Sequence, residues 1–373
     1  MGAYTPGLKV TPAALLHFER RLPLTGTVEV KQGDRVSWDQ VVARTNLPGR
    51  VEMVNLANRF GVAAAELPEL LLKKEGDSIE KGEILGYSKG FFGFFKSPYR
   101  SPIKGTLESI STATGQVILR TDPRPIDIKA YVDGVVEEVE EDQGVTLKTY
   151  GTLIQGIFGL GGETSGVLEI LASGPAETVY KSEINESHRD KVLVVGKHAT
   201  AELVLRAAEV GASALIAGGI DDADVRELLG YDLGVAITGN EKLGVTLVVT
   251  EGFGPLAIAD KTFELLQKKA GHRASVSGAT QIRAGVIRPE IIVTDLDGDW
   301  EKQTEEPPDL ELAVGVPVRL IRAPHFGELG SVTGLPVQPV VIPSGAKVRV
   351  AEVELHDGTK LTLPRANLEL IEG

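Results

Sequence analysis

Three apolar stretches in the middle of the chain end at residues that could bind an anion. The stretches KVLVVG, SALIAGG and VTLVVTEGFG have the continuous hydrophobicity of strands that are buried on both faces of a parallel sheet. In such sheets, ligands bind beyond the carboxyl ends of the strands, where helix N-termini present free N–H groups. A lysine there would bind an anion, and a glutamate would accept a hydrogen bond from a hydroxyl group. The candidate ligand-binding residues at these ends are Gly196, Lys197, Thr200, Gly218, Gly219, Glu251, Gly252 and Gly254.

A fourth stretch, SVSGATQIRAGVIRPEIIV (275–293), adds polar side chains to the same predicted site. They are Thr280, Gln281, Arg283 and Arg288. The arginines would recognise a carboxylate or a phosphate through two parallel hydrogen bonds. The dinucleotide fingerprint GxGxxG and the phosphate loop GxxxxGK[ST] are both missing from the sequence. Two interpretations therefore stay open: a small-molecule site, and tight turns in which the glycines serve the backbone alone.

The sequence gives less support for a metal site or a catalytic site than for an anion site. Asp221, Asp222 and Asp224 stand where a helix begins, and they are interpreted as capping residues rather than as Mg²⁺ ligands. His198 has no orienting partner in the sequence, so a surface or capping position is expected. The chain has no cysteine, which excludes disulfides, thiolate nucleophiles and iron–sulfur clusters. We predict no metal and no cofactor; because no nucleophile with a matching acid and base can be named, enzymatic activity stays an open question.

Length and charge limit the class of protein. A chain of 373 residues is expected to form two to four domains. The net charge of -13 opposes non-specific binding to nucleic acid, because such binding needs Lys and Arg to neutralise phosphates. The sequence begins without a basic segment followed by an apolar one, and it contains no uncharged apolar run of about 18 residues. We predict a cytoplasmic protein without integral membrane insertion.

Helical patterns separate the three apolar stretches. The segment TAELVLRAAEVG (200–211) has apolar residues at Leu203, Val204 and Ala207 and stops at a glycine. Strands that alternate with helices form a parallel α/β layer. We therefore predict a three-layer α/β domain over residues 188–294, followed by an acidic linker over residues 295–311.

Residues 1–182 show the short alternating strands of an all-β fold. The segments 26–43, 69–86 and 133–155 share a strand, a turn near Gly and Asp, and a β-branched continuation. From Pro23 to Ile170 the pattern resembles the barrel-sandwich hybrid of biotinyl and lipoyl carriers, membrane-fusion adaptors and subunits of ion-pumping oxidoreductases. The resemblance implies a module of the kind that elsewhere serves in carriers and adaptors, and it does not identify a particular family.

Four phenylalanines stand where a carrier domain turns its hairpin around a modified lysine: Phe91, Phe92, Phe94 and Phe95. In carriers this lysine lies between methionines or beside an aspartate, and neither Lys89 nor Lys96 has such a neighbour. We therefore predict that the domain is unmodified. The phenylalanines either fill the barrel or form an exposed tip that anchors a partner or a membrane surface, and both interpretations stay open.

Residues 312–373 resemble the KOW motif on a small SH3-like barrel, from VRLIRAPHFGELGSVTGL to VAEVELHDGTKLTLPRANLELI. In transcription elongation factors and ribosomal proteins such domains bind RNA or proteins, and the resemblance implies one of these partners. The module carries both signs of charge. Its basic residues are Arg319, Arg322, Lys347, Arg349, Lys360 and Arg365. Glutamates and aspartates offset them, so a protein partner or a purely structural use is preferred over RNA.

These patterns predict a multidomain protein that combines α/β and all-β parts: a barrel-sandwich hybrid, a parallel α/β domain and a small SH3-like barrel. The preferred hypothesis is a non-catalytic modular binding or scaffold protein, with or without gating by a small ligand. The first alternative is a nucleotide or anion sensor, or an enzyme, that uses the α/β domain. The second is an RNA- or ribosome-associated factor that acts through the KOW-like domain.

Overall fold

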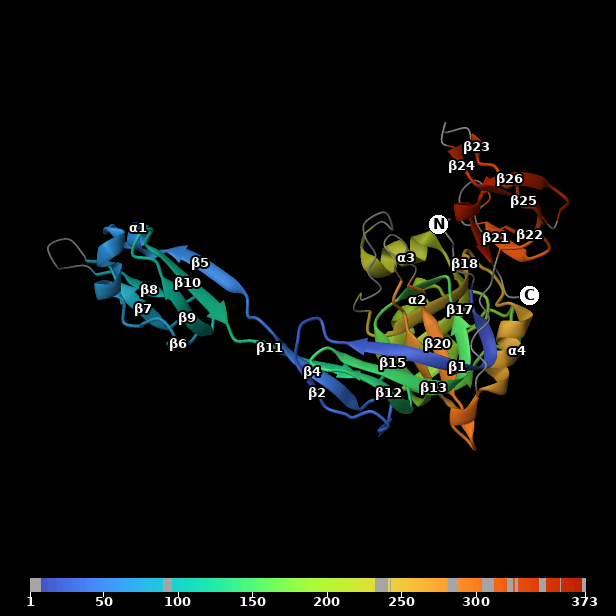
Figure 1. The fold of residues 1–373 in the computed structure, drawn as a ribbon, viewed down its shortest axis with the longest axis horizontal. Helices are drawn as coiled ribbons and strands as arrows, with labels where there is room; N and C mark the ends of the chain where they lie inside the picture. Colours follow the sequence, from blue (N-terminus) through green and yellow to red (C-terminus); the bar gives the residue numbers. More distant parts are fainter. Residues whose placement is uncertain are drawn as a thin grey trace.

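The computed structural model describes residues 8–89, 96–231, 241, 243–280, 287–303, 312–320, 325, 328–341, 347–355 and 357–370. Most of these residues lie in strands, and the architecture combines α/β and all-β parts (Figure 1). This confirms the mixed class that the sequence predicts. Within the described ranges, no helix is long and apolar enough to cross a membrane. Phe91, Phe92, Phe94 and Phe95 lie outside the described residues, as do Gln281 and Arg283.

The largest sheet forms the core of the body, which comprises residues 8–47 and 124–303. In sheet order its strands are β14 (Phe158–Leu160), β18 (Thr246–Phe253), β17 (Ala214–Ile220), β16 (Lys191–Val194), β15 (Glu163–Ile170), β19 (Arg273–Ser277), β20 (Glu290–Thr294), β13 (Gly144–Gln155), β12 (Gly134–Glu140) and β3 (Arg35–Val36), and β1 (Val10–Arg21) pairs with β13. Strands β15 to β18 are parallel neighbours, as the apolar stretches predict. Helices α2 (Ala201–Val210), α3 (Asp222–Leu229) and α4 (Asp260–Lys268) follow β16, β17 and β18.

Local sequence accounts for these elements. All seven residues of β17 are buried, because both faces of this central strand are covered. Helix α2 begins at Thr200, whose hydroxyl accepts the N–H of Leu203 at 3.3 Å. It ends at Gly211, where φ of 80° is a left-handed conformation that glycine adopts without strain. Strands β13 to β15 fall within the predicted N-terminal β domain of residues 1–182, yet in the structure they belong to the large sheet.

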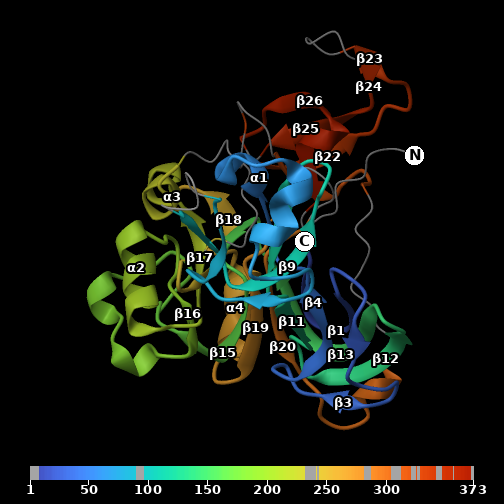
Figure 2. The ribbon, with the colours of Figure 1, turned by 90° about the vertical axis from the view of Figure 1, so that its left-hand side faces the viewer.

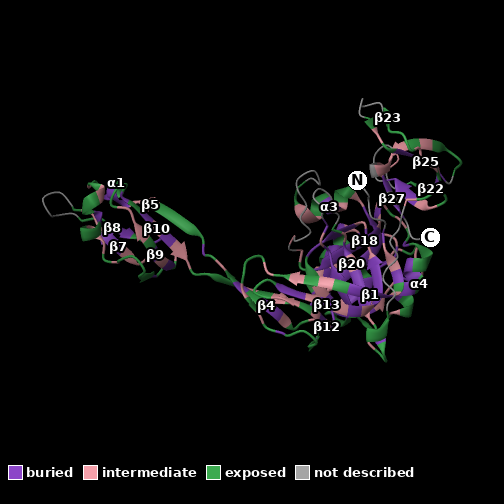
Figure 3. Cartoon of the chain, viewed as in Figure 1, coloured by how far each residue is buried: buried purple, intermediate pink, exposed green. Residues whose placement is uncertain are grey.

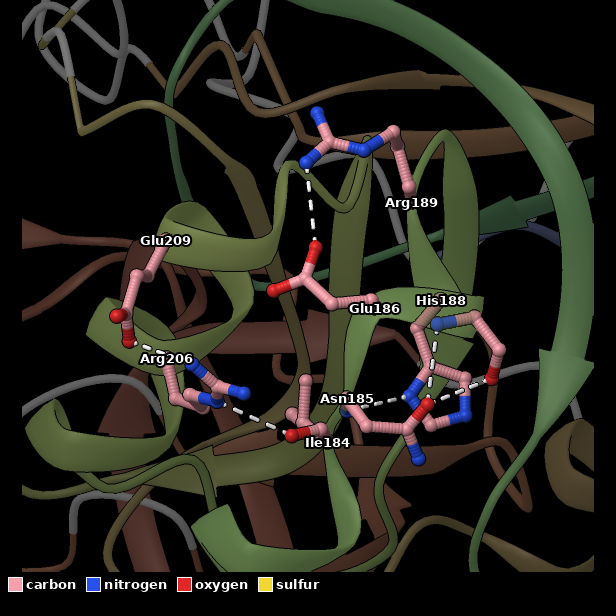
Figure 4. A network of polar contacts seen from close by, with 8 residues as sticks. Ile184, Asn185, Glu186, His188, Arg189, Arg206 and Glu209 are labelled. Carbon is pink, nitrogen blue, oxygen red and sulfur yellow. Dashed lines mark hydrogen bonds and ion pairs between the residues drawn. The ribbon is translucent and has the colours of Figure 1, made fainter.

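A polar network fixes the segment before β16 against α2 (Figure 4). The buried His188 ring accepts the N–H of Asn185 through Nδ1 at 3.1 Å, at the start of the 3₁₀ helix η3 (Glu186–His188). Arg206 of α2 donates to the carbonyl of Ile184 at 3.1 Å and to Glu209 at 2.7 Å. His188 is therefore a structural histidine.

The other 3₁₀ helices are η1 (Ala64–Leu70), η2 (Lys181–Glu183), η4 (Trp300–Lys302) and η5 (Arg365–Asn367).

Residues 51–121 form a lobe that projects from the body (Figures 1 and 3). Its elements are β5 (Val51–Asn55), α1 (Leu56–Phe60), η1, β6 (Ser78–Ile79), β7 (Ile84–Tyr87), β8 (Pro98–Arg100), β9 (Gly105–Ile110) and β10 (Gln116–Thr121). They enclose a hydrophobic cluster of their own, which includes Leu67, Leu107 and Leu119. The stalk consists of β4 (Val41–Leu47) and β11 (Arg124–Lys129), which pair antiparallel, and β2 (Thr27–Val28) extends it. The lobe is thus an insertion between two paired strands.

Residues 312–370 form a separate C-terminal domain (Figure 2). Its sheet has the order β26 (Lys360–Pro364), β25 (Val350–Leu355), β22 (Leu329–Gly334), β21 (Pro317–Leu320) and β27 (Leu368–Leu370), beside the pair β23 (Val340–Val341) and β24 (Lys347–Val348). Val318, Val332 and Val353 contribute to its own core. The N–H of Leu8 donates to the carbonyl of Leu370 at 3.0 Å, which joins the domain to the start of β1.

Candidate functional site

The carboxyl ends of β16, β17 and β18 lie at one edge of the large sheet, because the three strands are parallel neighbours. His198 forms a parallel bridge with Gly219, and the N–H of Gly219 donates to the carbonyl of Lys197 at 3.0 Å. The structure thus brings most of the predicted residues to this edge: Gly196, Lys197, Thr200, Gly218, Gly219, Glu251, Gly252 and Gly254.

Loops of the chain itself cover the glycines at this edge. A β-carbon on Gly196 would lie 2.3 Å from the carbonyl oxygen of Glu177, in the loop after β15. A β-carbon on Gly218 would lie 2.0 Å from the carbonyl oxygen of Leu256, and one on Gly219 would lie 1.8 Å from that of Gly254. These positions need glycine because neighbouring backbone approaches them closely. The geometry favours the backbone interpretation over a glycine cradle for a ligand.

Two polar members of the predicted site are engaged by the protein. Thr200 caps α2, as described above. Glu251 accepts the N–H of Ala259 at 3.0 Å through Oε1 and pairs with Arg319 of the C-terminal domain at 2.6 Å through Oε2. The side chains of Glu251 and Arg319 are only 14% and 5% exposed. Glu251 therefore joins two parts of the protein and is not free to accept from a ligand hydroxyl.

A cleft of about 530 Å³ opens beside this ion pair, between α4, β1 and the C-terminal domain. Lys261 and Lys268 line it together with Asp260 and Glu264. Because both signs of charge alternate along α4, the cleft does not select an anion.

Thr280 and Arg288 lie at the opposite edge of the sheet, so their predicted convergence with Lys197 is wrong. The reason is strand direction: β19 runs antiparallel to β15, and its last residue, Ser277, pairs with Glu163 at the start of β15. The buried Thr280 hydroxyl instead accepts the N–H of Gly159 at 2.8 Å. Gln281 and Arg283, predicted with them, lie outside the described residues.

His198, Asp221 and Asp224 form a cluster that the sequence interpretation missed. The Nε2 atom of His198 lies 3.3 Å from an oxygen of Asp221 and 3.7 Å from an oxygen of Asp224. Ligand atoms of all three residues lie within 4.8 Å of one another. The capping interpretation is wrong for Asp221, whose side chain makes no capping hydrogen bond although it occupies the N-cap of α3. The signal in the sequence was the position of these residues, directly after two neighbouring parallel strands.

A second titratable cluster lies at the amino end of β15. Glu163, Ser277 and Glu290 are aligned across β15, β19 and β20. Burial, reinforced by the negative charge of Glu163, raises the pKa of Glu290 to about 7, while Tyr131 and Arg20 act in the opposite direction. Arg20 holds Glu163 through two hydrogen bonds of 2.7 Å.

Tyr131 completes this second cluster. Its φ of 75° is a strained conformation for an aromatic residue. Its buried hydroxyl has no hydrogen bond of ordinary geometry among the described residues, although the Glu290 carboxyl interacts with it. Burial raises the pKa of Tyr131 well above its usual range, so the phenol is neutral.

Comparison with known proteins gives no family for the chain: no protein-family model matches it, and no curated protein matches its sequence.

Proposed function

We propose that the protein is a non-catalytic modular binding protein that presents the lobe of residues 51–121 to a protein partner. One observation carries this proposal: the lobe has its own hydrophobic core and stands away from the body on the two-stranded stalk (Figure 1). An insertion that contributes nothing to the core of the body is free to contact another molecule. The resemblance to the barrel-sandwich hybrids of adaptor proteins belongs to this proposal.

The exposed face of the lobe supports a protein partner. Val51 and Met53 point to the outer face of β5 and are 45% and 65% exposed. Ile118 pairs with Met53 on the neighbouring strand and extends the same face. Exposed apolar side chains gathered on one face are typical of protein contact sites.

Features of the body weigh against the two alternatives. A nucleotide or anion sensor needs open strand ends, and here the loops after β15 and β18 cover Gly196, Gly218 and Gly219. An RNA-binding C-terminal domain needs accessible basic side chains, and Arg319 is buried against Glu251. Lys360 is 76% exposed, but Glu354 lies 3.3 Å from its ammonium group and offsets its charge. Arg365 donates to the carbonyls of Val350 and Pro336, which leaves Lys347, Arg349 and Lys360 as the exposed basic residues of the described part of the domain. The SH3-like domain is proposed to act as a structural part of the body.

Excision of the lobe tests the proposal. Leu47 pairs with Arg124 at the outer end of the stalk, so a two-residue Asn-Gly turn in place of residues 48–123 joins the strands. The body should fold unchanged, because the lobe has a separate core. Chemical crosslinking in an extract of the native cells, followed by mass spectrometry, compares the partners of the two chains. Partners that crosslink equally to both chains would contradict the proposal.

A pair of point variants sharpens this test. Met53→Glu charges the exposed face of the lobe, and Leu205→Glu charges another exposed apolar position, on α2 of the body; the two side chains are 65% and 50% exposed. We expect the first to weaken partner capture and the second to leave it unchanged. A thermal-shift screen with nucleotides and anions tests the sensor alternative, because a ligand at 100 times its Kd should stabilise the protein by about 2.7 kcal/mol.

A further inference from the structure

We propose that His198, Asp221 and Asp224 form a binding site for a divalent transition-metal cation. The three side chains come from two elements, since His198 follows β16 and both aspartates belong to the start of α3. Their ligand atoms lie within 4.8 Å of one another. Metal–ligand bonds of about 2.0–2.2 Å to nitrogen and oxygen place neighbouring ligands roughly 3 to 4 Å apart. Small rotations of the side chains bring the three atoms to this spacing.

The nitrogen of His198 is the observation that points to a ligand. The Nε2 atom is buried, in a side chain that is 15% exposed, and it makes no hydrogen bond of ordinary geometry among the described residues. Two carboxylate oxygens lie within ion-pair distance of it, at 3.3 Å and 3.7 Å. A buried polar atom without a partner is costly, and two adjacent carboxylates repel each other. A cation between the three side chains removes both penalties, because it accepts the nitrogen lone pair and neutralises the carboxylates.

Hydrogen bonds around the cluster hold two of its members in place. Backbone hydrogen bonds on both sides of His198 hold it against Gly219. The carbonyl of Lys197 accepts the N–H of Gly219, and the N–H of Ala199 donates to the carbonyl of Gly219 at 2.9 Å. Oδ1 of Asp224 accepts the N–H of Ala201 at 2.8 Å, which leaves Oδ2 directed at His198. Outer partners of this kind orient metal ligands and are a regular part of metal sites.

The ligand types define the class of cation. One imidazole nitrogen and two carboxylate oxygens suit Zn²⁺, Mn²⁺, Fe²⁺ or Co²⁺, whereas Ca²⁺ and Mg²⁺ prefer oxygen alone. Three protein ligands leave at least one coordination position for water or another small molecule. The side chain of Asp221 is 49% exposed, so solvent reaches the cluster from its side. The site is independent of the lobe and therefore goes beyond the binding function proposed above.

An ion pair without metal is the competing explanation. The distances from His198 to both aspartates also fit the limits of ion pairs. The two explanations differ in their response to metal. The ion pair alone binds no cation, whereas the metal site binds one.

Titration of the full-length protein distinguishes these explanations. The protein is first freed of metal with a chelator, which is then removed, and Zn²⁺ is added in a calorimeter while Co²⁺ is followed by visible absorption. We expect one equivalent of Zn²⁺ to bind in competition with Co²⁺. Asp221→Ala should weaken this binding by at least about 100-fold, because loss of an outer-shell partner alone already costs roughly 10- to 100-fold.

Asp222→Ala is the matched control, because Asp222 is the next residue on α3, is exposed and pairs with Arg226 at 3.0 Å. It should bind Zn²⁺ like the unchanged protein. Since Asp221 makes no capping bond, its replacement leaves the fold intact, which circular dichroism verifies. His198→Ala should also remove the bound equivalent. The proposal is overturned if the unchanged protein binds no Zn²⁺ or if Asp221→Ala binds as tightly as Asp222→Ala.

Discussion

Replacement of Glu290 by glutamine should remove a large part of the pH dependence of the body's stability. In the folded protein, burial and the charge of Glu163 raise the pKa of Glu290 from 4.5 to about 7. Between these values the folded chain holds a proton that the unfolded chain has lost, so stability falls as pH rises from 4.5 to about 7 and is level above that. At about 1.4 kcal/mol per pH unit, the loss amounts to about 3 kcal/mol.

Tryptophan fluorescence suits this measurement, because both tryptophans of the chain, Trp38 and Trp300, lie in the body. The ring of Trp38 packs under the guanidinium of Arg273 on β19, so its emission reports on the large sheet. Urea unfolding is followed from pH 5 to 8 for the unchanged protein and for Glu290→Gln. We expect the unchanged protein to lose about 3 kcal/mol relative to the variant over this range.

The exposed Glu227 on α3 provides the control, because Glu227→Gln removes a carboxyl that water already solvates. Its unfolding free energy should follow that of the unchanged protein at every pH. A difference between Glu290→Gln and the unchanged protein that stays constant from pH 5 to 8 would refute the raised pKa.

Two further predictions concern the carboxyl edge of the sheet and its contact with the C-terminal domain. Gly219→Ala should destabilise the protein by at least about 3 kcal/mol, because the new β-carbon would lie 1.8 Å from the carbonyl oxygen of Gly254. Gly162→Ala is the control, because a β-carbon at this position meets no atom within 4 Å. It should change stability by less than about 0.5 kcal/mol. Equal losses of unfolding free energy for the two variants in urea would show that the loop after β18 does not contact Gly219 closely. Arg319→Met should cost about 3–5 kcal/mol, because it leaves the carboxylate of Glu251 buried without its cation. Addition of Glu251→Gln should restore most of this loss in calorimetry, and a double variant as unstable as Arg319→Met would argue against a buried ion pair.

The parts of the fold that depend on local patterns were predictable. Continuous apolar runs that stop at glycine predicted β16, β17 and β18, and the apolar spacing and glycine stop of residues 200–211 predicted α2. Their common edge followed from the rule that parallel strands end together. Strand direction was not predictable for β19, because a buried strand has the same hydrophobic pattern in either direction. Thr280 and Arg288 were therefore placed at the wrong edge.

Long-range partners were equally hidden. Nothing local distinguishes Glu251, which pairs with a residue 68 positions away, from a glutamate that is free to bind a ligand. The same holds for β4 and β11, which pair across the whole inserted lobe. An aspartate at the start of a helix predicts a capping hydrogen bond. Only the structure shows that the side chain of Asp221 makes none.

The second titratable cluster also marks the point where the stalk leaves the body. Strand β11 ends at Lys129, whose carbonyl accepts a hydrogen bond from Arg20 at 2.8 Å. Two residues later, Tyr131 donates its N–H to Trp38 and accepts a hydrogen bond from Ser275 through its carbonyl. These bonds hold Tyr131 in its strained conformation and fix the base of the stalk to β1 and β19.

Tyr131 and the positive charge of Arg20 both lower the pKa of Glu290, so the charge of this carboxyl acts at the base of the stalk. Ionisation of Glu290 adds a second negative charge beside Glu163. The guanidinium of Arg20, which already bonds to Glu163 and donates to the carbonyl of Lys129, then interacts with two carboxylates. The pH dependence that we expect for the body's stability therefore originates at the base of the stalk, where Glu290 changes from its protonated to its ionised form.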